Sequence, residues 1–508
     1  MKRIVNITLA LLLLTPLSSG AQGSNEKANP NYRNVFWLHG IQGDVNSLKA
    51  MSDYFRATYQ INSYHPSYVS NRGFVEAAFQ LSGGSSIGIA NNDIAIAHSM
   101  GGLVSRQYYK DYPNRRFGGL ITLNSPHLGA EFASSFDNGK IKNLFDRVKD
   151  EGIAGYKVMG SAVGNINTFH YNTLKAAERF GQAKGAIQEY NNTLFTACTI
   201  GGVLLSVPGA LIANWMVNYF SAKKIKEEIV PFVKDFAASG IELASLYVFG
   251  PNEGPVYEHS KNDLKPTSSA INSLKAATMN CPRITIAGTA DYPAGIRFLG
   301  STLSYMEQPN PGIGDISDNL AYDVTKAIAK DSRACESEYW RQYKNGSWWS
   351  LGLTNSYYLE RRDAFKRQAL FWENGFEREY QKCLGSIYYT TETRTVTEYV
   401  WVSNGGINDP IQLPLMPIID EPQPYNPIDP GTGSDGYWQL VTRTYTVTVE
   451  NIHPNDGIVT LPSQHGLAGA TTKTIPQTNH EQAKRSRGVR DYLVSQFNSH
   501  PYFKIDKK

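Results

Sequence analysis

The sequence predicts an α/β protein built on a mainly parallel, doubly wound sheet. Three continuous apolar runs support this prediction, at residues 35–38, 94–97 and 120–123. Each run is short enough for one strand and ends at a turn, and helical stretches separate the three. Strands that helices bury on both faces are typical of parallel sheets. Such a sheet binds its ligands at the carboxyl ends of the strands, so residues there are the first candidates for a site.

Composition and charge indicate a globular protein and argue against a nucleic-acid partner. The chain has 508 residues, 41% hydrophobic and 19% charged, which is an ordinary globular composition. Its formal net charge is only +4, which is too mild to indicate a nucleic-acid partner. A basic cluster near the C-terminus is predicted to be a solvated helix face; it comprises Lys484, Arg485, Arg487 and Arg490.

The N-terminal segment has the layout of a signal peptide, predicted to span residues 1–21. Lys2 and Arg3 form a basic head, residues 9–14 are apolar, and small residues lie at 18–21. The apolar stretch is too short to cross a bilayer, so we expect cleavage and a secreted or periplasmic protein. An exported chain with four cysteines can form two disulfides in any of three pairings. The cysteines are Cys198, Cys281, Cys335 and Cys383, and none has the spacing of a zinc site.

The predicted core is divided by insertions. Residues 22–140 form its first part, and residues 141–280 are predicted to be a helical, lid-like insertion. Residues 194–220 within it carry no charge, and Gly and Pro residues interrupt them at 201–202 and 208–209. We interpret this stretch as a buried or lid-forming helical hairpin. Contact with a lipid surface and a true membrane span are the alternatives.

The second half of the chain returns to the core twice. Residues 281–305 contain a core strand at 283–289, and residues 306–385 are predicted to form a helical insertion. Residues 386–452 contain two segments rich in Thr, Tyr and Val, which favour antiparallel strands, joined by a Pro/Gly-rich loop. We therefore expect a β-hairpin arm there, as a β-rich insertion, and the end of the core at 453–508.

Ser99 is the candidate nucleophile. It lies in Ala97-His98-Ser99-Met100-Gly101-Gly102, directly between an apolar strand and a helix-like stretch. A nucleophilic serine on such a tight turn needs small neighbours two residues away on either side, and Ala97 and Gly101 meet that need. Acyl transfer also needs two backbone N–H groups aimed at the oxyanion. Met100, after the nucleophile, and Ile41, in the loop at His39-Gly40-Ile41, are predicted to supply them.

These motifs resemble those of the bacterial secreted lipase and esterase group of the α/β-hydrolase superfamily. The matching pieces are Leu38-His39-Gly40-Ile41, Ala97 to Val104, and Asn124-Ser125-Pro126-His127-Leu128-Gly129. The resemblance covers the first part of the mature chain and a C-terminal piece. It implies an α/β-hydrolase core and a Ser-Asp-His triad in that chain order. Ala97 departs from the usual Gly of the family.

The resemblance also implies the acid and the base. Asn455-Asp456-Gly457-Ile458-Val459 and Thr478-Asn479-His480 look like the family's acid and base pieces, so Asp456 is assigned as orienting acid and His480 as base. Asp291, after the strand at 283–289, is the rival acid. His39, His98 and His127 are expected to be structural, and His465 lies in a turn. No metal or cofactor is expected.

The sequence therefore predicts an exported serine carboxylic ester hydrolase, a lipase or esterase that degrades lipid or other esters through an acyl-enzyme. A phospholipase or an acyltransferase would use the same triad. An interaction protein with a vestigial hydrolase core is the alternative from another class. The expected partner is a lipid or other ester substrate, with lipid-interface contact through residues 194–220.

Overall fold

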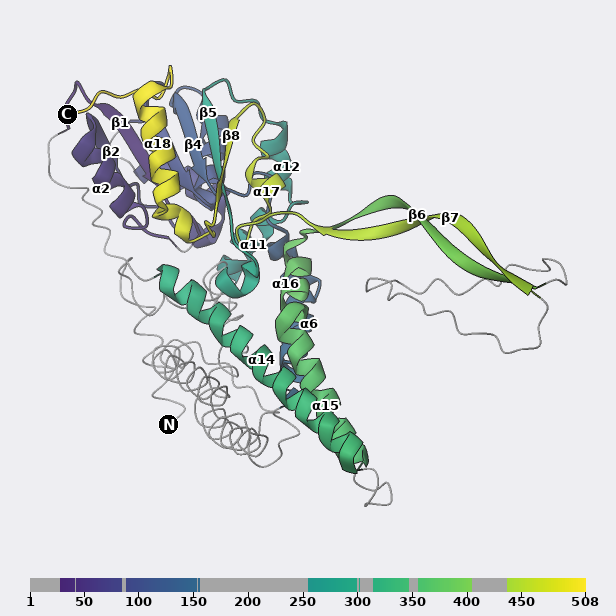
Figure 1. The fold of residues 1–508 in the computed structure, drawn as a ribbon. Coiled ribbons are helices and arrows are strands. Elements are labelled where there is room, and N and C mark those ends of the chain that lie inside the picture. The colour runs from purple at the N-terminus through teal and green to yellow at the C-terminus, as the bar shows by residue number, and fades with distance from the viewer. Residues whose placement is uncertain are drawn as a thin grey trace, which may run out of the picture. The chain divides into compact units, whose positions relative to one another are not determined.

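A computed structural model describes residues 28–41, 43–84, 88–152, 154–155, 255–298, 301, 314–346, 355–403 and 436–508. The chain divides into two compact units, the larger comprising Met1–Ser386 with His453–Lys508 and the smaller comprising Ile387–Ile452 (Figure 1). The predicted signal peptide, the charge-free residues 194–220, Cys198 and the loop at 404–435 lie outside the described residues.

The larger unit is built on a six-stranded sheet in the order β2-β1-β3-β4-β5-β8. Every neighbouring pair is parallel. The strands are β1 (Arg33–Leu38), β2 (Ile61–Tyr64), β3 (Ile94–His98), β4 (Gly119–Leu123), β5 (Arg283–Thr289) and β8 (Thr471–Pro476). The three apolar runs and residues 283–289 therefore form the four central strands. The predicted fold class, with its mainly parallel doubly wound sheet, is confirmed.

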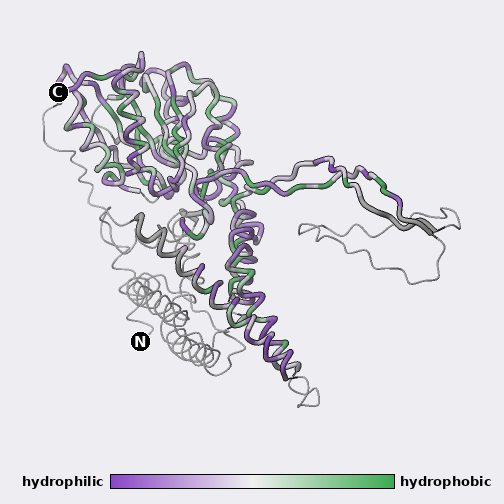
Figure 2. Tube along the Cα trace, viewed as in Figure 1, coloured by the Kyte–Doolittle hydropathy of each residue, from purple (hydrophilic) through white to green (hydrophobic). Residues whose placement is uncertain are grey.

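Helices cover both faces of this sheet, as the alternation of side chains along a strand requires. Val35 and Trp37 of β1 belong to one apolar cluster, and Phe36 and Leu38 belong to the other. The first cluster is completed by α2 (Lys49–Thr58) and α18 (Arg487–Ser499), and the second by α3 (Phe74–Gly84), α4 (Met100–Asp111) and α12 (Ser269–Ala276). Figure 2 shows hydrophobic stretches along the central strands. The sheet is thus buried on both sides.

Further helices extend this second apolar cluster. They are α5 (Glu131–Asp137), α6 (Lys140–Asp150), α11 (Pro255–Leu264), α14 (Gly314–Gly346), the π-helical turn η4 (Phe371–Gly375) and α16 (Phe376–Leu384). Helix α15 (Asn355–Leu370) packs along α14 and leads into η4. Shorter turns are η1 (Ser70–Arg72), α17 (Leu461–Gln464) and η5 (Gln482–Lys484). Within the described part of the chain, no helix is both long and apolar enough to cross a membrane. The predicted lid-like insertion falls largely outside that part and stays a prediction.

The smaller unit is one antiparallel hairpin of β6 (Ile387–Ser403) and β7 (Gly436–Ile452). Its register pairs Ile387 with Ile452 and continues to Ser403 with Gly436. Threonines dominate the middle of both strands, and cross-strand hydroxyl pairs join Thr395 to Thr444 and Thr397 to Thr442. Such pairs stabilise a hairpin that lacks a large core of its own.

Candidate active site

The candidate site lies where the strand order of the sheet reverses. β1 and β3 are neighbours, but the chain leaves β1 toward β2 on one side and leaves β3 toward β4 on the other. Loops that follow strands on the two sides of such a switch point diverge and leave a crevice. Gly40 follows β1 and Ser99 follows β3, so both lie at this crevice. The sequence motifs therefore meet where a doubly wound sheet binds its ligands.

Ser99 occupies a strained turn between β3 and α4. Its φ is 54° and its ψ is −128°, a conformation that residues with a Cβ rarely adopt. The turn is held by Ser99 N–H, which donates to the Leu123 carbonyl at 2.9 Å, and by Gly102 N–H, which donates to the Ser99 carbonyl at 3.1 Å. A Cβ at Gly101 would lie 2.6 Å from the carbonyl oxygens of Leu38 and His39. Only glycine fits there, which explains the small residue that the motif requires.

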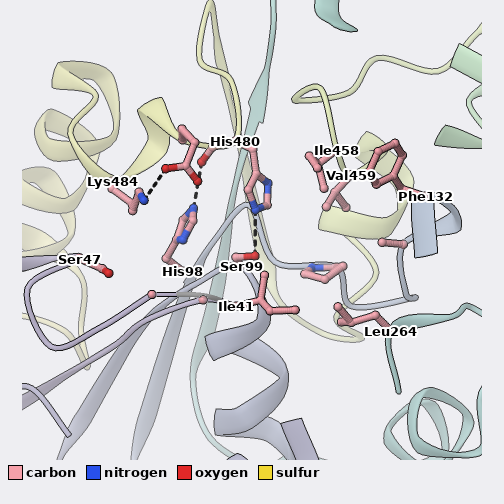
Figure 3. Close-up of a pocket in the computed structure, with 15 residues that line it drawn as sticks. Ile41, Ser47, His98, Ser99, Phe132, Leu264, Ile458, Val459, His480 and Lys484 are labelled. Atoms are coloured by element: carbon pink, nitrogen blue, oxygen red, sulfur yellow. Dashed lines mark hydrogen bonds and ion pairs between the residues drawn. The ribbon is translucent and has the colours of Figure 1, made fainter. Parts of the chain in front are cut away.

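Two hydrogen bonds connect Ser99 to Asp456 through His480. The Ser99 Oγ lies 2.8 Å from His480 Nε2 (Figure 3). On the other side of the imidazole ring, His480 Nδ1 lies 2.8 Å from Asp456 Oδ2. All three side chains are buried, with Asp456 at 0% and Ser99 and His480 at 5% exposure. His480 N–H also donates to the Asp456 carbonyl at 2.8 Å, which ties the two loops together. The structure thus brings together the three residues that the sequence singled out.

The orientation of the Asp456 carboxylate is fixed by its own loop. Its second oxygen, Oδ1, accepts hydrogen bonds from the backbone N–H groups of Ile458 at 3.0 Å and Val459 at 2.7 Å. The turn depends on Gly457, whose φ is +92°. Asp291, the rival acid, is instead exposed just beyond the end of β5. Among the described residues, Asp456 is therefore the carboxylate in contact with His480.

The two predicted oxyanion donors lie on either side of Ser99. Ile41 lines the same pocket as Ser99, and Met100 is the first residue of α4. Within the described part of the chain, neither backbone N–H donates a hydrogen bond to another protein group. A Cβ at Gly40 would lie 2.7 Å from the Ser99 Cβ, so the loop after β1 passes directly beside the serine. The oxyanion role of these two N–H groups stays a prediction from the sequence.

Three other histidines surround the site in structural positions. His98 Nε2–H donates to the His480 carbonyl at 2.9 Å, and burial holds the pKa of His98 well below its usual range. His39 stacks on Tyr68 with ring centroids 4.1 Å apart, and burial lowers its pKa to about 4. His127 is buried, with its Nε2 lying 2.9 Å from the Thr122 hydroxyl. Burial keeps the rings of His39 and His98 neutral, which suits a packing role.

The lowered pKa of His39 predicts that acid weakens the fold. The folded-state pKa of about 4 lies below the unfolded value of 6.5, so the unfolded chain takes up the proton first as pH falls. The stability from neutral His39 is present above pH 6.5 and is lost toward pH 4, about 3 kcal/mol in all. Urea unfolding of the wild type and of His39→Gln at pH 7 and pH 5 measures this loss. Between the two pH values, the free energy of unfolding of the variant should fall by about 2 kcal/mol less than that of the wild type. Equal losses in the two proteins would contradict the lowered pKa of His39.

The pocket around Ser99 has one apolar wall and one polar wall (Figure 3). The apolar wall comprises Ala130, Phe132, Leu264, Ile458 and Val459. The polar wall comprises Ser47, His98, Glu481 and Lys484. Lys484 is only 4% exposed and its Nζ lies 2.5 Å from Glu481 Oε2. The prediction that Lys484 lies on a solvated helix face is wrong, because α18 begins only at Arg487, after a cap in which the Ser486 hydroxyl accepts from Val489 N–H.

Two further expectations concern cysteines and metals. Cys281 and Cys383 are free thiols in the structure, so none of the three pairings into two disulfides that the sequence allowed is formed. Within the described ranges, no cluster of three His, Cys, Asp or Glu side chains could hold a metal ion.

Comparison with known proteins gives a family match around the nucleophile. Residues 89–178 match the family model described as PGAP1-like alpha/beta domain. These residues include β3, Ser99 and α4. No curated protein matches the chain.

Similar solved structures are distant. They include wild-type Cfl2 from Burkholderia cenocepacia, with 11% identity and a TM-score of 0.23 over 52% of this chain and 74% of that one. A thermophilic esterase from Thermogutta terrifontis has 14% identity and a TM-score of 0.21, over 57% of this chain and 90% of that one. A Bacillus megaterium epoxide hydrolase has 13% identity and a TM-score of 0.20, over 56% of this chain and 81% of that one. These values are too low for any conclusion about function. The parallel sheet, the strained serine turn and the family match together identify the larger unit as an α/β-hydrolase fold.

Proposed function

We propose that this chain is an exported serine hydrolase that cleaves carboxylic esters, with Ser99 as nucleophile, His480 as base and Asp456 as orienting acid. The observation that carries the proposal is the pair of 2.8 Å hydrogen bonds that join Asp456, His480 and Ser99 at the strained turn. A serine hydroxyl is a weak nucleophile unless a base accepts its proton, and the base needs a carboxylate to fix its tautomer.

The reaction follows from this arrangement in two halves. The Ser99 Oγ attacks the ester carbonyl carbon while its proton moves to His480 Nε2, and Asp456 stabilises the imidazolium. The carbonyl oxygen becomes an oxyanion that accepts hydrogen bonds from the N–H groups of Ile41 and Met100. The intermediate then releases the alcohol, which takes the proton from His480. Water attacks the acyl-enzyme by the same route and releases the acid.

The pocket favours an ester with an apolar acyl part. The wall that contains Phe132, Leu264 and Val459 offers apolar surface in the same pocket as Ser99. Removal of such surface from water contributes roughly 25 cal/mol per Å² to binding. A lipase, a phospholipase and an acyltransferase share this chemistry and differ in the alcohol or acceptor. Export rests on residues 1–21 and contact with lipid on residues 194–220, both of which remain predictions from sequence.

The test is a panel of p-nitrophenyl esters of increasing acyl length together with a fluorophosphonate probe. We expect hydrolysis of at least one ester and covalent labelling that peptide mapping locates at Ser99. Product analysis with an added alcohol separates hydrolysis from acyl transfer. A correctly folded protein that cleaves none of the esters and takes up no probe would overturn the proposal.

A further inference from the structure

Helix α16 directs two buried polar side chains at the loop that carries Asp456. The Tyr380 hydroxyl donates to the Gly457 carbonyl at 2.8 Å, and the Gln381 Oε1 accepts from the Asn455 side-chain amide at 2.8 Å. Tyr380 and Gln381 are 1% and 2% exposed. The two residues that flank Asp456 are therefore each bonded to the same helix.

The Gln381 amide has only one orientation that satisfies its neighbours. Its Nε2 donates to Glu377 Oε1 at 2.6 Å, so its Oε1 must face Asn455. Glu377 is itself buried and accepts from Gly295 N–H at 3.0 Å, in the segment that follows β5. The helix is thus locked to the post-β5 segment on one side and to the Asp456 loop on the other.

The loop itself passes this restraint on to the carboxylate. The Asn455 Oδ1 accepts from Gly457 N–H at 3.0 Å, and the Asn455 carbonyl accepts from Ala290 N–H at 2.8 Å. Asp456 lies between these fixed points, with its Oδ2 at 2.8 Å from His480 Nδ1. A shift of α16 would therefore move the partner of His480.

We propose that Tyr380 and Gln381 are positioning residues that hold the Asp456 carboxylate in line with His480. This inference rests on the proposed function and adds to it a role for a helix outside the sheet. Apolar side chains of similar shape could fill the same space, and a typical buried hydrogen bond adds only about 1 kcal/mol to net stability. What the hydrogen bonds add is direction, since a carboxylate displaced by about 1 Å can lower turnover by about a hundredfold.

The experiment compares Tyr380→Phe with the wild type. The variant keeps the ring and removes only the hydroxyl that binds the Gly457 carbonyl. We expect kcat to fall about tenfold while KM stays within about twofold, because the contact does not touch substrate. The acidic limb of the kcat/KM profile should move to lower pH, because a misaligned Asp456 stabilises the His480 imidazolium less. A purely structural defect would lower kcat/KM by the same factor at every pH and leave the acidic limb where it is.

Two further variants provide a second test of the same loop and a matched control. Gln381→Met removes the acceptor for Asn455 and should give the same pattern. Tyr59→Phe removes a buried hydroxyl contact to Asn498 at 2.9 Å, in the cluster on the opposite face of the sheet, and should leave kcat and the profile unchanged. If Tyr380→Phe does not fold, Gln381→Met carries the test.

The decisive measurement is a double-mutant cycle with Asp456→Asn. If α16 acts through Asp456, Tyr380→Phe should cause no further loss of the residual turnover in that background. A tenfold loss that persists there, or an unchanged kcat in both α16 variants, overturns the positioning role while the ester hydrolase stands. A folded wild type that neither cleaves esters nor labels at Ser99 overturns both proposals.

Discussion

Ser99→Ala is expected to lower ester turnover roughly ten-thousandfold or more while the protein stays folded. Among the described residues, the hydrogen-bond partner of the Ser99 Oγ is His480, so removal of the Oγ leaves the strained backbone and the packing in place. Alanine carries the same Cβ as serine and adopts the same turn without a new clash. The measurement is kcat/KM on the best ester of the panel, with a thermal unfolding curve of each protein.

Labelling by the fluorophosphonate probe gives this expectation a second readout. The probe should modify the wild type at Ser99 and leave Ser99→Ala unmodified. Ser125 is a matched control serine, because it is also buried and follows a neighbouring strand, yet its hydroxyl has no hydrogen-bond partner among the described residues. Ser125→Ala should label like the wild type. Wild-type turnover in Ser99→Ala, or a label at another serine, would exclude Ser99 as the nucleophile.

Asp456→Asn is expected to cause a loss of similar size, roughly thousandfold to ten-thousandfold. The oxygen of the new side-chain amide would stay toward Ile458 and Val459, because both of their N–H groups need an acceptor. The amide nitrogen would then face His480 Nδ1 and donate to it. The imidazole would be forced to carry its proton on Nε2, where it could no longer accept the proton of Ser99. The change disables the base without removing it.

Asp291→Asn is the control for this prediction. Asp291 is exposed beyond β5, so its amide variant should keep kcat/KM within about twofold of the wild type. Both variants are measured on the same ester, with circular dichroism to show that each is folded. The reverse result, a crippled Asp291→Asn beside a nearly active Asp456→Asn, would move the acid to the end of β5.

The central strands could be predicted from the sequence because burial on both faces leaves an unbroken apolar run. The edge strands β2 and β8 could not, since an edge strand needs fewer apolar residues. In β8 only Ile475 is buried, and the other residues of Thr471–Pro476 include three threonines and a lysine. Period-two alternation is weak in so short a segment. The sheet was therefore predictable at its centre and not at its two edges.

The candidate site, too, could be predicted only in part from the sequence. Ser99 and His39-Gly40-Ile41 lie on local motifs, because a tight turn restricts residues that are close in sequence. The contacts of Tyr380 and Gln381 with the Asp456 loop join positions more than seventy residues apart and leave no local pattern. The burial of Lys484 does not follow from the sequence for another reason. A basic run of this kind is typical of one solvated helix, whereas the structure has η5, a cap at Ser486 and then α18.

The hairpin of β6 and β7 begins and ends at adjacent points of the larger unit. Ser386 precedes it and His453 follows it, and His453 N–H donates to the Ser386 carbonyl at 2.8 Å. For the hydrolase core, everything between these two residues is a single closed loop whose entropy of closure changes only slowly with its length. Evolution could therefore lengthen, shorten or replace the arm without shifting Asp456, three residues further on. The junction makes this part of the protein a module whose length can change while Ser386 and His453 stay hydrogen-bonded.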